Sequence, residues 1–134
     1  MTPALEQSVT FNAKPMELYR MFMDSALHSA ATGMPAKVSS KVGGQWSAFG
    51  KMLVGRNLAL LPGRMIVQSW RSSQWKKDDP DSVLVVSFQK EGKHTTLHLT
   101  HVGVPKYDYK GVTKGWPKYY WQPWKAYLAK RKRR

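Results

Sequence analysis

The first third of the sequence combines two hydrophobic periods. Leu5–Phe11 places apolar and polar side chains on alternate faces, a period of two that predicts a β-strand. Pro15 can open a helix that runs to about Met23, because proline is well suited to the first helical position. Asp24 or Ser25 can cap a second short helix that ends near Gly33. The chain is therefore predicted to open as strand, helix, helix.

From residue 36 to residue 102 the pattern is typical of antiparallel strands separated by turns. Gly43-Gly44 and residues 90–93 are hairpin signals, and residues 61–64 (LPGR) favour a type II turn. Gly55 lies inside a predicted strand, where we expect weakened pairing or a bulge. The strands predicted in this region span residues 36–42, 45–49, 52–61, 65–71, 82–89 and 95–102.

The C-terminal stretch predicts one long helix with a wide apolar face. Thr113 is the predicted N-cap, Pro117 falls near the first turn, and Pro123 should kink the helix. An apolar face this wide needs a curved sheet along much of its length. At about 100° per residue, one arc of the helix contains Val112, Trp116, Tyr119, Tyr120, Pro123, Trp124, Tyr127 and Leu128.

This order of elements predicts one α+β domain over residues 1–134, in which a sheet and a helix share one core. The sheet has about six to seven antiparallel strands that wrap around the long C-terminal helix, and two short helices follow the first strand. No internal repeat or flexible linker divides the chain. A basic tail at residues 129–134 ends it.

Several short motifs follow one another along nearly the whole chain. They are residues 43–50 (GGQWSAFG), 55–58 (GRNL), 66–71 (IVQSWR), 79–82 (DPDS), 97–105 (LHLTHVGVP) and 115–124, from Gly115-Trp116 to Trp121-Gln122-Pro123-Trp124. Together they closely resemble the activator of heat-shock protein 90 ATPase homologue family. That family belongs to the START-like (SRPBCC) helix-grip superfamily of hydrophobic-pocket proteins.

The resemblance implies a helix-grip fold and a non-enzymatic, co-chaperone-like protein. Such a protein would bind heat-shock protein 90 and modulate its ATPase cycle. The full-length activator has a further N-terminal domain, and this chain matches only the C-terminal one. Because Met1 runs directly into the first predicted strand, we expect a stand-alone version with weaker ATPase stimulation. The superfamily also implies a second function, binding of a hydrophobic small molecule by a carrier or a cyclase-like protein.

The charge balance is strongly basic. The chain has 22 Lys and Arg against 8 Asp and Glu, a formal net charge of +14, which favours acidic partners. A basic surface suits docking on an acidic chaperone, where charge raises the association rate more than the affinity. The predicted partner surface contains Lys51, Arg56, Lys114, Lys118 and Lys125.

The basic residues 130–134 leave two interpretations open. Such a run can be a nuclear-import signal or bind a polyanion, which gives a third candidate function. It can equally be a solvated helix end, where cations suit the helix dipole. Neither a recognition-helix pattern nor an RNP-type aromatic strand accompanies it, so nucleic-acid binding has no support from a motif.

Several classes of protein are excluded by composition. With no cysteine, the chain has no disulfide and no cysteine-type zinc site. No apolar run approaches the roughly 20 residues needed to span a bilayer. The N-terminus has no hydrophobic block of a signal peptide. We therefore expect a cytoplasmic monomer without a cofactor.

The candidate catalytic and metal-binding side chains are His28, His94, His98 and His101. His98 and His101 fall on opposite faces of a strand, and His94 and His98 stand roughly 13 Å apart. Neither pair therefore predicts a metal site. His101 shares its face with Leu97 and Leu99, so it could anchor a ligand or act as a base. It could equally be a core histidine bonded to the backbone or to a tyrosine hydroxyl.

Other possible sites have weaker signals. Residues 78–81 (DDPD) lack the length and final glutamate of a calcium loop and are typical of a solvated turn. Ser47 is outside any nucleophile-elbow motif. No glycine-rich run joins a strand to a helix as nucleotide binding requires. We predict no catalytic, cofactor-binding or metal-binding residue.

The aromatic residues could either line a pocket between sheet and helix or fill the core. Trp75 and Trp121 do not fit the predicted interior, and exposed aromatics beside lysines can anchor a partner or stack on bases. The candidate pocket-lining residues are Trp46, Phe49, Trp70, Phe88, His101, Trp116, Tyr120 and Trp124.

Overall fold

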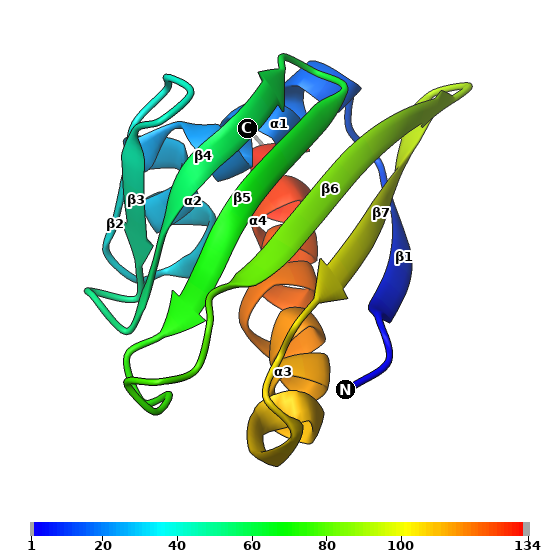
Figure 1. Cartoon of the computed structure of the whole chain (residues 1–134). Coiled ribbons are helices and arrows are strands. Elements are labelled where there is room, and N and C mark those ends of the chain that lie inside the picture. The colour runs from blue at the N-terminus through cyan, green and yellow to red at the C-terminus, as the bar shows by residue number, and fades with distance from the viewer. Residues whose placement is uncertain (1, 133–134) are drawn as a thin grey trace.

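An antiparallel sheet curves around a long C-terminal helix in the computed structural model, which describes residues 2–132 (Figure 1). The seven strands lie in the order β1-β7-β6-β5-β4-β3-β2. This α+β helix-grip arrangement confirms the predicted fold class. The strands are β1 Leu5–Phe11, β2 Ala36–Val38, β3 Gln45–Ala48, β4 Leu53–Leu61, β5 Met65–Ser72, β6 Ser82–Glu91 and β7 His94–Val102.

The opening of the chain is confirmed as strand, helix, helix. Helix α1 is Pro15–Met23, with proline in its first turn, and helix α2 is Ser25–Thr32. The Asp24 carboxylate caps α2 by accepting from the Leu27 N–H at 2.9 Å. Gly33 ends α2 with φ +78°, a left-handed conformation that glycine adopts without strain.

The C-terminal helix differs from its prediction. It begins with the 3₁₀ turn η1 (Lys106–Asp108) and continues as α3 (Tyr109–Trp116), so Thr113 is not its N-cap. A π-helical turn, η2 (Pro117–Trp121), follows and leads into α4 (Gln122–Lys132). Pro117 has no N–H to continue the α pattern, and the Gln122 N–H donates to the Pro117 carbonyl five residues earlier.

The π turn changes which side chains face the sheet. A π turn holds one residue more than an α turn, so positions beyond Pro117 are rotated relative to a regular 100° wheel. Tyr119, predicted on the apolar arc, is 49% exposed. Trp121, predicted outside the arc, is only 4% exposed. The prediction that Trp121 is an exposed anchor is therefore wrong.

Two strand predictions also need correction. The strand predicted at residues 36–42 ends at Val38, because the following loop turns back and is held by the side chain of Asn57. That amide donates to the carbonyls of Ser39 and Lys41 at 2.7 and 3.0 Å. The register shift between β4 and β5 falls between Asn57 and Ala59 instead of at Gly55, while the weakened pairing predicted at Gly55 is confirmed, since Gly55 and Arg56 have no partner on β5.

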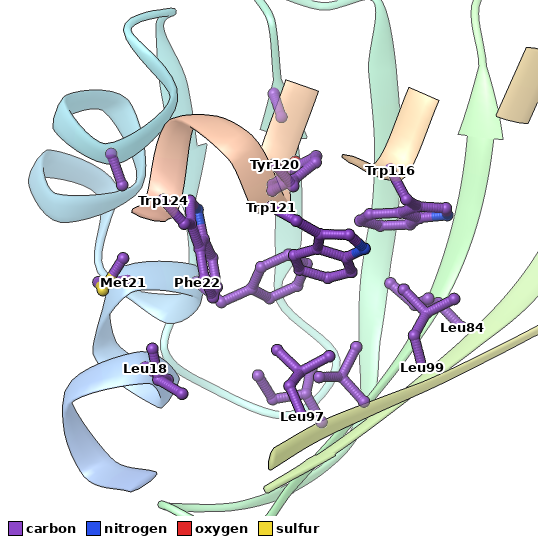
Figure 2. Packing of buried hydrophobic residues seen from close by; sticks show 14 of the residues in the cluster. Leu18, Met21, Phe22, Leu84, Leu97, Leu99, Trp116, Tyr120, Trp121 and Trp124 are labelled. Carbon is purple, nitrogen blue, oxygen red and sulfur yellow. The ribbon is translucent and has the colours of Figure 1, made fainter. Parts of the chain in front are cut away.

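The core lies between the sheet and the C-terminal helix (Figure 2). Leu84, Leu97 and Leu99 rise from β6 and β7 toward the tryptophans of the helix, and α1 closes one end. Trp75 is also buried, which corrects its predicted exposure, since its ring nitrogen donates to the Asp108 carboxylate at 2.7 Å. Within residues 2–132, no helix is long and apolar enough to cross a membrane.

Candidate functional site

A groove of about 480 Å³ opens between α3–η2 and the turn that joins β3 to β4. The ends of β4 and β5 and Met34, two residues after α2, complete its walls. Most of its lining is apolar or aromatic, as in sites that accept apolar groups. The lining residues are Met34, Phe49, Met52, Leu53, Trp70, Ser72, Gln74, Asp108, Gly111, Val112, Gly115, Trp116, Tyr119 and Tyr120.

The eight predicted pocket residues divide into two sets. Phe49, Trp70, Trp116 and Tyr120 line the groove. The other four do not line it, since they are buried in the core elsewhere. In that second set, the Trp46 ring nitrogen donates to the Ser69 carbonyl. Phe88 packs edge-on against Tyr19 of α1, and Trp124 contacts Phe11 and Phe22. The His101 side chain is fully buried.

Phe49 forms one wall of the groove in an unusual backbone conformation. The prediction placed it in a strand, but β3 ends at Ala48 and Phe49 has φ +54°. A bulky residue in this left-handed region carries strain of about 1–3 kcal/mol. Its ring meets the rings of Tyr119 and Tyr120 edge-on, with centroids 5.7 and 5.5 Å apart. These contacts hold Phe49 at the groove wall.

Two glycines keep the facing wall of α3 open. Gly111 and Gly115 both line the groove and lie one helical turn apart. A Cβ atom at Gly115 would meet only the ring of Tyr119, at 3.6 Å. Glycine in a helix is about 1 kcal/mol less favourable than alanine. Glycine at position 115 therefore makes the helix less stable than alanine would, although a Cβ atom would fit there.

The mouth of the groove is apolar and exposed to solvent. Met34 and Met52 are 46% and 45% exposed, and Tyr119 stands between the groove and solvent. Methionine and tyrosine are adaptable contact residues and are enriched in the cores of protein interfaces. These three side chains form an exposed apolar rim, which we call the groove mouth.

Three exposed lysines neighbour groove-lining residues in the sequence. Lys51 precedes Met52, Lys114 and Lys118 flank Gly115 on the helix, and all three lysines are exposed. The Lys118 ammonium lies over the Tyr119 ring, 5.3 Å from its centroid. These are three of the five residues of the predicted partner surface.

The other two predicted partner residues, Arg56 and Lys125, do not line the groove either. The Arg56 guanidinium on β4 donates to the Gly43 carbonyl at 3.1 Å. Lys125 lies on α4, beyond the π turn, and does not neighbour a lining residue in the sequence. None of the five predicted partner residues lines the groove itself, and their role as a partner surface stays a prediction.

Asp108 is the only charged residue among those that line the groove within the described chain. One carboxylate oxygen accepts from the Trp75 ring nitrogen, so the acid helps to fix the β5–β6 loop against the start of α3. The signs of charge are thus separated, with an acid at one end and lysines at the mouth.

His101 is a satisfied core histidine. Ser82 donates its hydroxyl hydrogen to the Trp70 carbonyl at 2.7 Å, so His101 Nε2–H must donate to the Ser82 oxygen, also at 2.7 Å. Nδ1 then accepts from the Trp116 ring nitrogen at 3.3 Å. Burial lowers the pKa of His101 to about 3, so the ring is neutral. Both ring nitrogens are occupied inside the core.

Sequence reasoning missed the hydrogen bond between His28 and Tyr120. His28 Nδ1–H donates to the Phe22 carbonyl, and Nε2 accepts from the Tyr120 hydroxyl, both at 2.9 Å. Burial lowers the pKa of His28. This bond fixes the groove-lining Tyr120 from behind. The spacing of the side chains along α2 could have indicated that His28 is buried. No sequence signal identifies its partner 92 residues away.

A second groove of about 650 Å³ is lined by residues at the start of α1 and in two turns of the sheet. Figure 1 shows these turns at the end of the sheet where α1 begins. The turns between β4 and β5 and between β6 and β7 form its walls. Its ionisable lining residues are Lys14, Lys90, Lys93 and His94. Here Met16 is an exposed apolar side chain. This groove is basic and lacks the aromatic lining of the first.

No group of three His, Cys, Asp or Glu side chains that could hold a metal ion occurs in the part of the chain that the structure describes. The basic tail, which begins at residue 129, is a separate feature. It is helical as far as Lys132, and the Arg131 guanidinium pairs with the Glu17 carboxylate of α1 at 2.9 Å. Residues 133–134 lie outside the described residues.

Comparison with known proteins identifies the family. A family model described as activator of Hsp90 ATPase homolog 1-like protein matches residues 12–129. The chain belongs to this family. A relative named activator of 90 kDa heat shock protein ATPase homolog, from Dictyostelium discoideum, is 29% identical over 116 residues, which are 86% of this chain and 30% of the relative. Activator homolog 1 from Homo sapiens is 29% identical over 113 residues, 84% of this chain and 33% of that protein.

The Hsp90-activator relatives in the curated set are therefore longer, and the chain spans about a third of their length. Among solved structures, an HSP90 activator from Plasmodium falciparum superposes with a TM-score of 0.86 at 26% identity, covering 96% of this chain and 97% of that chain. A protein from Mesorhizobium loti has a TM-score of 0.82 at 18% identity, covering 96% of this chain and 98% of that one, and shows the fold alone. The predicted family is confirmed.

Proposed function

We propose that this protein is a co-chaperone that binds heat-shock protein 90 and modulates its ATPase cycle. The observation that carries the proposal is the family match over residues 12–129. It is supported by the similarity to a Plasmodium falciparum chain that is titled an HSP90 activator and is covered over 97% of its length. A chain of this size is therefore a reasonable unit for the activity.

The surface of the chain suits such a partner. A net charge of +14 attracts an acidic protein, and at the apolar groove mouth the exposed Lys118 lies over the Tyr119 ring while the exposed Lys51 precedes Met52. Complementary charge accelerates encounter, while apolar contacts at the centre of an interface supply most of the affinity. The groove mouth and its lysines offer both kinds of contact on one face.

The steady-state ATPase rate of a full-length heat-shock protein 90, measured against increasing concentrations of this chain, tests the proposal. We expect a saturable change in rate that disappears when an ATP-site inhibitor of the chaperone is added. A rate that stays constant up to a large molar excess of the chain would contradict the proposal.

Charge reversal supplies matched variants for that assay. The double variant Lys51→Glu with Lys118→Glu should raise the concentration of this chain that gives a half-maximal change in ATPase rate by about tenfold. The reason is that both introduced carboxylates repel an acidic partner. Lys90→Glu with Lys93→Glu makes the same change in net charge at the second groove and should have a smaller effect. Equal effects would indicate that only net charge matters.

A second candidate function is binding of an apolar small molecule, and the groove of about 480 Å³ favours it. Native mass spectrometry of the purified protein should then reveal a bound molecule that Gly115→Leu removes. Without such a molecule, and without quenching of Trp70 and Trp116 fluorescence by apolar ligands, this candidate would be rejected.

We also propose that the chain has no catalysis of its own. His101, the strongest candidate base, is fully buried with both ring nitrogens hydrogen-bonded. A general base must reach the proton that it abstracts. Turnover of an ester or polyketide-like substrate that His101→Ala abolishes would overturn this proposal.

A further inference from the structure

On the basis of the function proposed above, we propose that the groove mouth is the docking surface for heat-shock protein 90. We infer that the groove receives an apolar side chain from an acidic segment of the chaperone. Four observations support this assignment: the form of the groove, its exposed rim, its charges and the contrast with other surfaces.

The groove is kept open by features that folding alone does not favour. Phe49 adopts φ +54°, Gly115 occupies a helix position where a Cβ would fit, and the π turn lies beside them. Backbone strain and π turns both concentrate at functional sites. Three independent departures from regular structure thus meet at one groove, which indicates that it is shaped for an occupant.

The exposed rim indicates a macromolecular occupant. A small molecule inside the groove would cover only the parts of Met34 and Met52 that face the lining, although nearly half of each residue is exposed. A protein partner would cover them while one of its side chains enters the groove. Exposed apolar side chains that are grouped and ringed by charge are typical of protein interaction sites.

The charges specify an acidic partner segment. Lys118 lies over the ring of the mouth residue Tyr119, and the exposed Lys51 is next in sequence to the mouth residue Met52. The one acid in the lining, Asp108, already accepts a hydrogen bond from Trp75. An apolar side chain flanked by carboxylates would therefore find complementary groups at the mouth.

Other surfaces fit less well. The second groove has lysines but only one exposed large apolar side chain, Met16, so it can attract anions without an apolar anchor. The outer face of the sheet exposes Leu58, Val83 and Val102, and none of these side chains lines either groove. The first groove combines an apolar anchor point with a basic surround.

Methionine oxidation footprinting tests the assignment with reporters that the chain already contains. Met34 and Met52 report on the groove mouth, Met16 reports on the second groove with comparable exposure, and Met65 on β5 lies outside both grooves. The chain would be treated with dilute peroxide alone and with saturating full-length heat-shock protein 90. Sulfoxide at each methionine would be followed by mass spectrometry.

We expect oxidation of Met34 and Met52 to slow several-fold in the complex, while Met16 and Met65 keep their rates. If the complex forms but Met16 or Met65 is protected instead, this assignment is wrong and the proposed function stands. If the two proteins do not bind under any condition, both the proposed function and this assignment are wrong.

A groove-filling substitution provides a second measurement. Gly115→Leu adds a side chain at a groove-lining position, where outside the helix's own backbone a Cβ would meet only the Tyr119 ring, and it should weaken binding at least about tenfold, as loss of an interface anchor does. Ala126→Leu makes a similar addition at an exposed position of α4 and should leave binding unchanged. Circular dichroism checks that both variants fold. Unchanged affinity of folded Gly115→Leu would overturn the assignment.

Discussion

The indole rings of Trp116 and Trp121 stack on each other although they are five positions apart in the helix. Their centroids are 5.5 Å apart and their planes differ by 17°. In a regular α-helix, neighbours on one face are three or four residues apart. The π turn at Pro117–Trp121 instead aligns positions five apart, which brings both rings into the core. This stack links the groove wall at Trp116 to the interior.

Truncation of the stacked ring should destabilise the protein far more than truncation of its exposed neighbour. Trp121→Ala should lower the free energy of unfolding by about 3–5 kcal/mol, as for a large buried aromatic. Tyr119→Ala should lower it by about 1 kcal/mol or less, because that side chain is half exposed. Urea denaturation monitored by circular dichroism checks the ranking. The reverse order would mean that the helix has a regular α period here.

Substitution of two glycines by alanine should have opposite effects on stability. Gly115→Ala should raise the free energy of unfolding by up to about 1 kcal/mol, because alanine favours the helix and its Cβ meets only the Tyr119 ring. Gly55→Ala should lower it by at least about 2 kcal/mol, because a Cβ there would lie 1.9 Å from the Ser69 carbonyl oxygen. Urea midpoints that move the same way for both would contradict this.

The free energy of unfolding should decrease as the pH is lowered, because of His101. Burial lowers its pKa from 6.5 to about 3, so as pH falls the unfolded chain binds the proton first. The stabilisation is fully present above about pH 6.5 and is lost progressively toward pH 3. At about pH 5 the expected loss from this group is about 2 kcal/mol.

A non-titrating variant isolates that contribution. The decrease in unfolding free energy between about pH 7.5 and pH 5 should be smaller in His101→Gln than in the natural chain by about 2 kcal/mol. The pKa of His28 is also lowered by burial, but His28 is present in both proteins and cancels in the comparison. An equal decrease in both proteins would show that His101 does not titrate on unfolding.

Removal of the basic tail should affect association more than affinity. Arg131 pairs with Glu17, but both side chains are partly exposed, so the pair contributes only about 0.2–1 kcal/mol to stability. Deletion of residues 130–134 should slow association with heat-shock protein 90 and leave most of the affinity, as measured by biolayer interferometry. If the deletion abolished both this binding and RNA binding, polyanion binding would become the better function.

The strands and short helices could be predicted from sequence because their signals are local. Alternation, Pro15, the Asp24 cap and Gly33 each act within a few residues. The π turn could not be predicted, because a helical wheel of 100° per residue assumes a constant period. The wheel therefore placed Tyr119 in the core and Trp121 outside it, the reverse of what is observed. The choice depends on packing against the sheet, which is a property of the whole fold.

The groove could be predicted only in part, for a similar reason. Aromatic composition indicated Phe49, Trp70, Trp116 and Tyr120 without separating them from core residues such as Trp124. That separation depends on the turn conformation at Phe49 and on the missing side chains at Gly111 and Gly115. A hollow is an absence of atoms, and residue types alone do not indicate it.

Calorimetric titration of this chain into full-length heat-shock protein 90 tests the central claim most directly. At about 50 mM and about 200 mM salt, the account predicts binding in both cases, several-fold weaker at the higher salt because the rim lysines are exposed to screening. Gly115→Leu should weaken binding at both concentrations, because the groove is apolar. The absence of binding at the lower salt concentration would contradict the account.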